Sequence, residues 1–226
     1  MERARVAVVT GGRGALGSAV VAALLERGWT VHAPRREGDD PAPTRVGLEQ
    51  HEADVADPEQ VERLFAAVDA RSGRLDALVN IAGGFAAAPI ERTTPEDWSR
   101  MLATNATTAF LCARAAVPRM KATGGGRIVS VAAAAALAPR PGMAAYVASK
   151  AVVVALTRAL AAELSEHRIT VNAIAPTTID TEANRAAMPK ADRTGWVAPA
   201  AIADTILFLL DDGSGAVTGT IVEMGR

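Results

Sequence analysis

The sequence predicts a doubly wound α/β fold, with a parallel sheet of seven strands and helices on both faces. Two observations predict it. Short apolar runs alternate with longer segments of helical periodicity along the chain, and a glycine-rich turn follows the first apolar run. A length of 226 residues with 50% hydrophobic content is enough to bury one substantial core. Since no linker or repeat divides the chain, we expect residues 1–226 to form a single domain.

The first unit of the fold is a strand, a glycine turn and a helix. A strand is expected over 4–10, the turn over 11–17 and the helix over 15–28. Such a turn lets the backbone approach a pyrophosphate and directs helix N–H groups at its charge, so it predicts a dinucleotide site. Two registers fit the turn: Gly12-x-Gly14-x-x-Gly17, and Thr10-Gly11-x-x-x-Ala15-x-Gly17.

The remaining elements follow from the same alternation and from helix-start signals. Asp57 and Pro58 are a capping residue and a first-turn proline, and an apolar stripe follows them. Thr94 and Asp97 have the spacing of a capping box. In order, further strands are expected at 29–33, 49–54, 76–82, 126–131, 168–174 and 216–223, and further helices at 58–72, 95–122, 143–165 and 199–210.

Tyr146 and Lys150 lie four residues apart in the helix expected over 143–165, which places a phenol and an ammonium on one helix face. A free phenol titrates near ~10, so it becomes a useful acid at neutral pH when a nearby cation lowers its pKa. The pair alone also fits an ordinary helix surface. Together with the glycine turn, it indicates a catalytic pair beside a nucleotide.

The end of the second strand indicates which nicotinamide cofactor is used. A site for NAD usually has an acidic residue there, whereas a site for NADP has an arginine for the 2′-phosphate. Arg35 falls at this position and Arg36 follows it, which predicts NADP(H) as the preferred cofactor. Arg13 in the glycine turn is a further phosphate ligand or a solvated side chain. Glu37 keeps NAD(H) possible.

These motifs together resemble the short-chain dehydrogenase/reductase family over nearly the whole chain. The Thr10-Gly11 register of the turn and the Tyr146–Lys150 pair match its two signatures. The resemblance implies a Rossmann domain, NAD(P)H-dependent oxidoreductase activity, and a homodimer or homotetramer paired through helices 95–122 and 143–165. The other matching segments are, in order, Asp54-Val55, Asn80-Ile81-Ala82-Gly83, Asn105, Val171–Pro176 and Val217–Gly219.

The resemblance also implies roles for individual residues. Tyr146 is expected to donate the proton, Lys150 to hold the ribose and bias the phenol, and Asn105 to support a water relay. The weakly periodic stretch 175–199 matches the family's mobile substrate lid in position. The implied cofactor-binding residues are Gly11, Arg13, Gly14, Leu16, Gly17, Arg35, Arg36, Asp54, Val55, Asn80, Ala82, Gly83, Tyr146, Lys150, Pro176 and Ile179.

One catalytic element of the family is missing. The family has a serine thirteen residues before the tyrosine, and Ala133 stands there. Ser130 lies three residues earlier in a strand, so we expect it to face the other side of the sheet. An alanine at this position is what dihydropteridine reductases carry, and segments 12–18, 82–85, 141–143 and 180–189 are similar to that subgroup.

The missing serine bears on the substrate. A ketone concentrates charge on oxygen as hydride arrives, whereas a conjugated imine or a quinonoid ring disperses it, so one donor is enough. We therefore expect an enzyme that reduces a small carbonyl, imine or quinonoid substrate. The alternative is a catalytically weak sensor or structural relative that binds NADP(H). The short length disfavours a sugar-nucleotide epimerase.

Composition excludes several other classes. A net charge of −1, from 24 Lys+Arg and 25 Asp+Glu, gives no reason to expect nucleic acid or an anionic membrane as partner. Cys112 is the only cysteine, which excludes an internal disulfide and fits the reducing cytoplasm. The first strand starts near Met1, which leaves no room for a cleavable signal, and we expect no apolar run of the ~18 residues that a membrane span needs.

The histidines and aromatic residues carry less information. His32, His51 and His167 have no metal-ligand spacing, so no metal site is expected. Phe85 follows a glycine pair and Trp196 lies in the expected lid. Either ring would flank a flat substrate or close the core.

Overall fold

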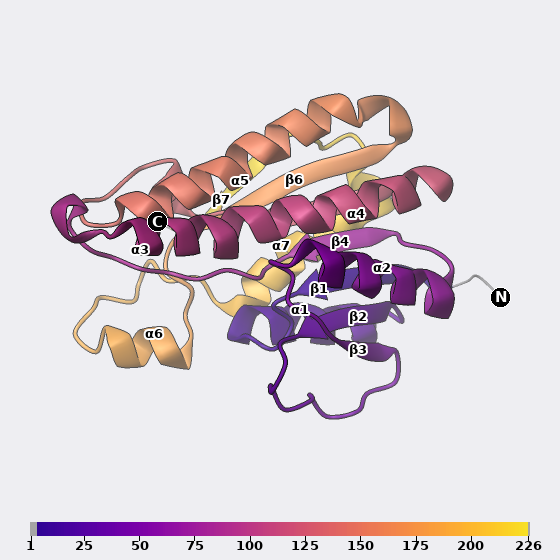
Figure 1. Ribbon diagram of the computed structural model, residues 1–226, viewed down its shortest axis with the longest axis horizontal. Helices are drawn as coiled ribbons and strands as arrows, with labels where there is room; N and C mark the ends of the chain where they lie inside the picture. Colours follow the sequence, from indigo (N-terminus) through magenta and orange to yellow (C-terminus); the bar gives the residue numbers. More distant parts are fainter. Residues whose placement is uncertain (1–3, 226) are drawn as a thin grey trace.

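The computed structural model describes residues 4–225 and contains a parallel sheet of seven strands in the order β3-β2-β1-β4-β5-β6-β7 (Figure 1). The chain first adds β2 and β3 on one side of β1 and then adds β4 to β7 on its other side. This order confirms the doubly wound fold. A crevice is expected where the strand order reverses, outside the carboxyl ends of β1 and β4. The strands are β1 Val6–Thr10, β2 Thr30–Arg35, β3 Leu48–Glu52, β4 Ala77–Asn80, β5 Gly126–Val131, β6 Ile169–Pro176 and β7 Ile221–Met224.

The helices occupy most of the predicted positions. They are α1 Ala15–Glu26, α2 Pro58–Ser72, α3 Pro95–Met101, α4 Thr108–Ala122, α5 Ala144–Glu163, α6 Glu182–Ala187 and α7 Pro199–Leu210. The single helix expected over 95–122 is interrupted by a π-helical turn, Leu102–Thr107, between α3 and α4. The sequence did not predict α6, because six residues are too few to establish a helical period.

Two layers of helices cover the sheet, and the alternation of side chains along each strand explains both. Val6 and Val8 of β1 pack in a core with α2, α4 and the end of α5, whereas Ala7 and Val9 pack in a second core with α1 and α7. Figure 1 shows α2, α4 and α5 along the same face of the sheet. Because both faces are covered, the central strands are buried throughout, as their continuous apolar runs predict.

The two predicted helix starts are confirmed. The Asp57 carboxylate accepts hydrogen bonds from the backbone N–H groups of Glu59 and Gln60, at 2.8 and 3.2 Å, in front of Pro58. Thr94 and Asp97 form a capping box, in which each side chain accepts from the backbone N–H of the other. These caps satisfy N–H groups that have no partner within the helix.

The expectation that no apolar segment is long enough for a membrane span is wrong for α5. Its 20 residues meet the usual limits of length and hydropathy. In the structure this helix lies across β6, and its buried face includes Val153 and Val154 in a small core with Ala173 and Ala175. Burial against a sheet explains the apolar composition of α5 equally well.

His32 and His51 form a pair that the sequence did not predict. Their rings stack, with His32 Nδ1 at 2.8 Å from His51 Nε2, and His32 Nε2 lies 2.8 Å from the Ser72 hydroxyl. Burial, followed by the neighbouring His51, lowers the pKa of His32 to about 4, so this ring is neutral at neutral pH. Within residues 4–225 no group of three His, Cys, Asp or Glu side chains is arranged to hold a metal ion.

The packing of α2 on the sheet predicts a large stability effect for Phe65, whose side chain is fully buried. Phe65→Ala should lower the free energy of unfolding by about 3–5 kcal/mol, because it removes a large apolar side chain and leaves a cavity. Urea unfolding measures the change. Val46→Ala, at a fully exposed position, is the control and should change stability by less than about 0.5 kcal/mol. A small effect at Phe65 would contradict the packing described here.

Candidate active site

The carboxyl ends of the strands border a cleft of about 1430 Å³. Its wall is built by the turn after β1, the ends of β2 and β3, the loop after β4, the end of β5, the start of α5 and the segment after β6. This is the place where an open parallel sheet binds its ligand.

The glycine turn packs tightly against its surroundings, and the contacts decide its register. Gly11 has a φ of +67°, and a Cβ there would lie 2.8 Å from the backbone nitrogen of Ala82. A Cβ on Gly17 would lie 2.0 Å from the carbonyl oxygen of Gly11. Both positions therefore require glycine, whereas Gly12 has an ordinary φ and does not border the cleft. The register Thr10-Gly11-x-x-x-Ala15-x-Gly17 is the correct one.

The threonine that opens this motif joins β1 to the loop after β4. The Thr10 hydroxyl oxygen accepts hydrogen bonds from the backbone N–H groups of Ile81 and Ala82, at 3.0 and 3.1 Å. Gly14 precedes α1, and no side chain among residues 4–225 caps this helix. The first N–H groups of α1 therefore face the cleft beside backbone that carries no Cβ, which suits a pyrophosphate.

Arginines gather at the end of the cleft formed by β2. Arg13, Arg35 and Arg36 all border it, as do Asp39 and Asp54. Arg35 is paired with Glu52 at 2.9 Å, whereas residues 4–225 contain no ion-pair partner for Arg13 or Arg36. Glu37, the acidic residue that the sequence indicated, does not border the cleft, and Asp39 does. The sequence reasoning missed Asp39 because its place depends on how the loop after β2 folds back.

Tyr146 and Lys150 face the middle of the cleft from the first turns of α5. The Tyr146 ring makes an edge contact with Phe85, with ring centroids 4.9 Å apart. The Lys150 ammonium is buried and donates a hydrogen bond of 2.8 Å to the carbonyl oxygen of Val131. The predicted pairing on one helix face is therefore present.

The pKa values of this pair differ from the sequence prediction. Lys150 was expected to lower the pKa of the phenol, but burial raises the pKa of Tyr146. Burial also lowers the pKa of Lys150 to about 8. Loss of water disfavours the charged form of each group. Tyr146 is consequently protonated at neutral pH in this structure, and Lys150 is mostly charged.

Asn105 lies on the π-helical turn, buried behind the cleft wall. Its carboxamide accepts from the Gly84 N–H at 2.9 Å and donates to the Gly84 carbonyl oxygen at 3.0 Å. The same amide group donates to the Ser149 hydroxyl at 3.0 Å, which in turn donates to the carbonyl oxygen of Tyr146 at 2.7 Å. Asn105 thus joins the loop carrying Phe85 to the helix carrying Tyr146, and the predicted water relay remains a prediction.

Ala133 borders the cleft, whereas Ser130 does not. The Ser130 hydroxyl accepts a hydrogen bond of 3.2 Å from the Asn80 side chain, so it does not replace the missing serine. Asn80 differs from expectation: it is buried at the end of β4 and is not part of the cleft wall. Its amide nitrogen donates to Ser130, whereas its buried Oδ1 has no hydrogen-bond partner within residues 4–225, and its role towards a cofactor remains a prediction.

The expected lid, 175–199, contains α6 and is anchored at its base. Backbone hydrogen bonds of 2.9 and 2.8 Å join Val197 N–H to the Thr178 carbonyl and Asp180 N–H to the Val197 carbonyl. Asp180 also makes a two-pronged ion pair with Arg185. Trp196 packs under the Arg193 guanidinium and does not border the cleft, so of the two candidate rings Phe85 alone faces it.

The structure brings the predicted cofactor residues together, with Asn80 as the exception. Sequence reasoning missed several cleft residues on the substrate side, and part of the signal was present. Met143, Asn184 and Met188 lie in stretches similar to the dihydropteridine reductase subgroup, whereas Thr104 and Arg140 carry no such signal. The unpredicted cleft residues include Thr104, Arg140, Met143, Asn184 and Met188 on the substrate side, and Asp39 at the β2 end.

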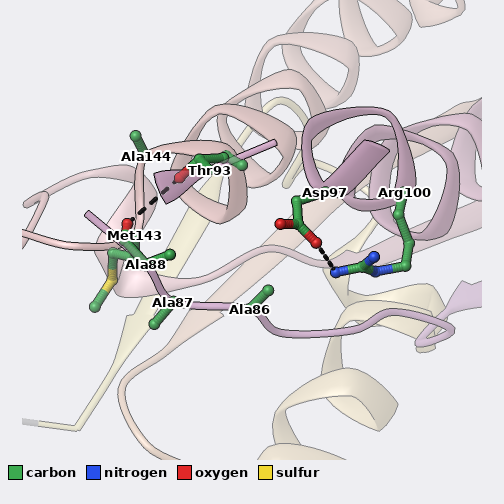
Figure 2. Close-up of a pocket in the computed structure, with 9 residues that line it drawn as sticks. Ala86, Ala87, Ala88, Thr93, Asp97, Arg100, Met143 and Ala144 are labelled. Atoms are coloured by element: carbon green, nitrogen blue, oxygen red, sulfur yellow. Dashed lines mark hydrogen bonds and ion pairs between the residues drawn. The ribbon is translucent and has the colours of Figure 1, made fainter. Parts of the chain in front are cut away.

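A second pocket of about 310 Å³ lies next to the cleft, and Met143 borders both. Figure 2 shows Ala86, Ala87 and Ala88 on one side of this pocket, and Asp97 paired with Arg100 on another. Because the two charges neutralise each other, the pocket presents small side chains and no net charge.

This chain is similar to known enzymes over nearly its whole length. Residues 5–192 match the family model for short chain dehydrogenase. D-threitol dehydrogenase of Mycolicibacterium smegmatis is 35% identical, over 95% of this chain and 89% of the relative. Acetoacetyl-CoA reductase of Shinella zoogloeoides is 34% identical, over 97% and 96%. A structure described as ElxO with NADP bound has a TM-score of 0.91 and 24% identity, over 99% of this chain and 97% of that one, which shows a shared fold.

Burial of the Lys150 ammonium predicts that this residue costs stability. Its pKa of about 8 in the folded chain lies below the ordinary 10.5, so below pH 8 the folded chain carries an unfavourable buried charge. Lys150→Met should raise the free energy of unfolding at pH 7 by about 1–3 kcal/mol. The gain should shrink as pH rises from 8 towards 10.5, where the folded parent loses the proton first.

Urea unfolding of parent and variant at pH 7 and pH 9 tests this prediction. Lys121→Met, at an exposed position of α4, is the matched control and should leave stability nearly unchanged. A less stable Lys150→Met variant would mean that the hydrogen bond to the Val131 carbonyl outweighs the burial of the charge.

Proposed function

Because this chain belongs to the short-chain dehydrogenase family of NAD(P)-dependent oxidoreductases, we propose that it is an NADPH-dependent reductase of a small carbonyl, imine or quinonoid substrate. The observation that carries the proposal is the position of Tyr146 and Lys150 in the middle of a cleft that has three arginines at one end. One cleft thus carries the proposed proton donor, Tyr146, and the arginines proposed to bind the cofactor phosphate.

The proposed cofactor would lie along this wall. Arg13, Arg35 and Arg36 would hold the 2′-phosphate, and the backbone of Gly11 and Gly17 would contact the pyrophosphate. The turn fits such a group, because Gly11, Gly14 and Gly17 border the cleft with no side chain to keep the pyrophosphate away from the backbone. When bound, the nicotinamide supplies the hydride.

The state of Tyr146 supports reduction. Burial raises its pKa, so the phenol keeps its proton at neutral pH and is able to donate it to the acceptor atom of a substrate. Lys150 lies one helical turn further along, and its charge would stabilise the phenolate left after donation. Asn105 would hold the loop around Gly84 so that Phe85 stays against the phenol.

Ala133 favours an imine or quinonoid substrate over a plain ketone. Ala133 supplies no hydroxyl at the point of the wall where the family has its serine, so Tyr146 would act without that second donor. The exposed Phe85 ring and the run Ala132–Ala135 offer flat, apolar walls, which suit a conjugated ring such as a quinonoid dihydropteridine. The relatives compared above are named for other substrates, so a carbonyl substrate stays within the proposal.

A sensor or structural relative that binds NADP(H) without turnover is the second candidate, and the absence of the serine favours it. Lys150 argues against it. A buried ammonium lowers stability, and although Lys150 would hold the ribose in either case, a protein without turnover has no use for the phenol of Tyr146 beside it in the cleft wall. A single-turnover assay that follows NADPH oxidation separates the two.

We also propose a cytoplasmic homodimer or homotetramer. Phe110 on α4 and Val152 on α5 are large apolar side chains that remain about half exposed, at 49% and 43%. Pairing of these helices between copies would cover them. The single free Cys112 is buried and fits a reducing compartment.

The arginines at the β2 end predict a cofactor preference. NADPH should bind at least ~10-fold more tightly than NADH, which corresponds to about 1.4 kcal/mol. Arg35→Ser should remove most of the difference, because it deletes one cation that faces the proposed phosphate. Fluorescence titration of both cofactors measures it. Equal affinities in the parent, or tighter NADH, would contradict the preference.

Ala133 predicts how substrate choice responds to restoring the serine. A donor of this kind is typically worth about 2.7–4 kcal/mol when charge concentrates on oxygen, and less when it is misplaced by ~1 Å. Ala133→Ser should therefore raise kcat/KM for a small ketone more than for a quinonoid dihydropterin. Tyr146→Phe, as the control, should lower turnover on both by about 10²-fold. If the ratio between substrates does not rise in the serine variant, Ala133 does not set the substrate class.

A further inference from the structure

The guanidinium of Arg35 is held from behind by an acidic residue on the neighbouring strand. Arg35 ends β2 and Glu52 ends β3, and the two residues are direct partners in the parallel register. Arg35 Nη2 lies 2.9 Å from Glu52 Oε2, and the arginine side chain is only 22% exposed. The ion pair therefore fixes the side chain at the edge of the sheet.

The loop after β2 holds the same guanidinium from another side. Arg35 Nη1 donates a hydrogen bond of 2.9 Å to the carbonyl oxygen of Asp39. The Asp39 carboxylate accepts from the backbone N–H of Arg36 at 3.2 Å, and the Asp39 N–H donates to the carbonyl oxygen of Arg36. These contacts make a closed turn over 36–39 around the Arg35 head group.

The contact with Glu52 holds the Arg35 guanidinium from the side away from the cleft, so its other side is available to a ligand in the cleft. Arg35, Arg36 and Asp39 border the cleft, whereas Glu52 does not. A guanidinium has five N–H groups in a fixed plane. Arg35 Nη1 donates to the carbonyl oxygens of Asp39 and, at 3.5 Å, of Arg36. Nη2 forms the ion pair with Glu52, and neither Nε nor Nη2 has a further hydrogen-bond acceptor within residues 4–225. The remaining donors are presented by a side chain that has already lost its freedom, so less entropy is lost when an anion binds.

We propose that Glu52 is a positioning residue for selection of the cofactor phosphate. It acts through Arg35, which it orients towards the 2′-phosphate of NADPH. This inference rests on the proposed NADPH preference. The negative charge of Glu52 acts in the opposite direction, because it weakens the attraction between the arginines and the phosphate. Since Arg35 lies between the carboxylate and the cleft, orientation outweighs that repulsion.

The test compares affinities of the full-length protein for NADPH, NADH and 2′,5′-ADP in the Glu52→Gln variant. Glutamine keeps the size of the side chain and removes the charge. The dissociation constants of NADPH and 2′,5′-ADP should rise about fivefold, the scale expected when a partly exposed ion pair behind a binding group is lost, while that of NADH changes less than about twofold. In the Arg35→Ala background, Glu52→Gln should have no further effect.

Glu49→Gln is the matched control, because Glu49 lies on the same strand and pairs with Arg71 at 3.1 Å, outside the cleft wall. It should leave all three affinities unchanged, and thermal unfolding of each variant verifies that it is folded. Unchanged or tighter binding of NADPH in Glu52→Gln would overturn the proposal, and so would equal losses for NADPH and NADH, which indicate a merely structural role. A parent that binds both cofactors equally contradicts the proposed preference, and the change in 2′,5′-ADP affinity still decides the role of Glu52.

Discussion

The turn between β1 and α1 packs backbone against backbone with the loop after β4, and the rest of the site is arranged around that contact. Gly11 and Gly17 are required there because a Cβ at either position would meet a main-chain atom at 2.8 or 2.0 Å. The Thr10 hydroxyl completes the junction by accepting two N–H groups of the loop. Close approach of these segments brings the start of α1, the end of β2 and the loop towards Phe85 to the border of one cleft.

Polar groups of this site are buried, which costs stability, and hydrogen bonds offset part of that cost. Lys150 keeps a charge at a position where burial lowers its pKa to about 8, with one carbonyl oxygen as its hydrogen-bond acceptor. Asn105 satisfies its amide with Gly84 and Ser149 and so couples two segments distant in sequence. Apolar residues at these positions would stabilise the core better. Buried polar residues are therefore expected there only where function requires them.

Local signals predicted the architecture because they depend on neighbours in sequence. The strand and helix alternation, the cap at Asp57 and the capping box at Thr94 need only a few adjacent residues to form. Periodicity failed where the pattern was short or continuous: α6 has too few residues, and the π-helical turn around Asn105 interrupts a helix whose sequence shows no break. The pairing of His32 with His51 also depends on strand register, which no single segment specifies.

By itself the sequence determined the fold class, the glycine turn, the Tyr146–Lys150 pair and the arginines after β2, because each is set by spacing along one element. Tertiary structure alone decided which glycines touch backbone, that Asn80 lies behind the cleft wall, and that Asp39 and not Glu37 borders it. It also decided the pKa directions of Tyr146 and Lys150 and the pairing of Arg35 with Glu52. These properties depend on burial and on contacts between segments remote in sequence, which arise only when the sheet assembles.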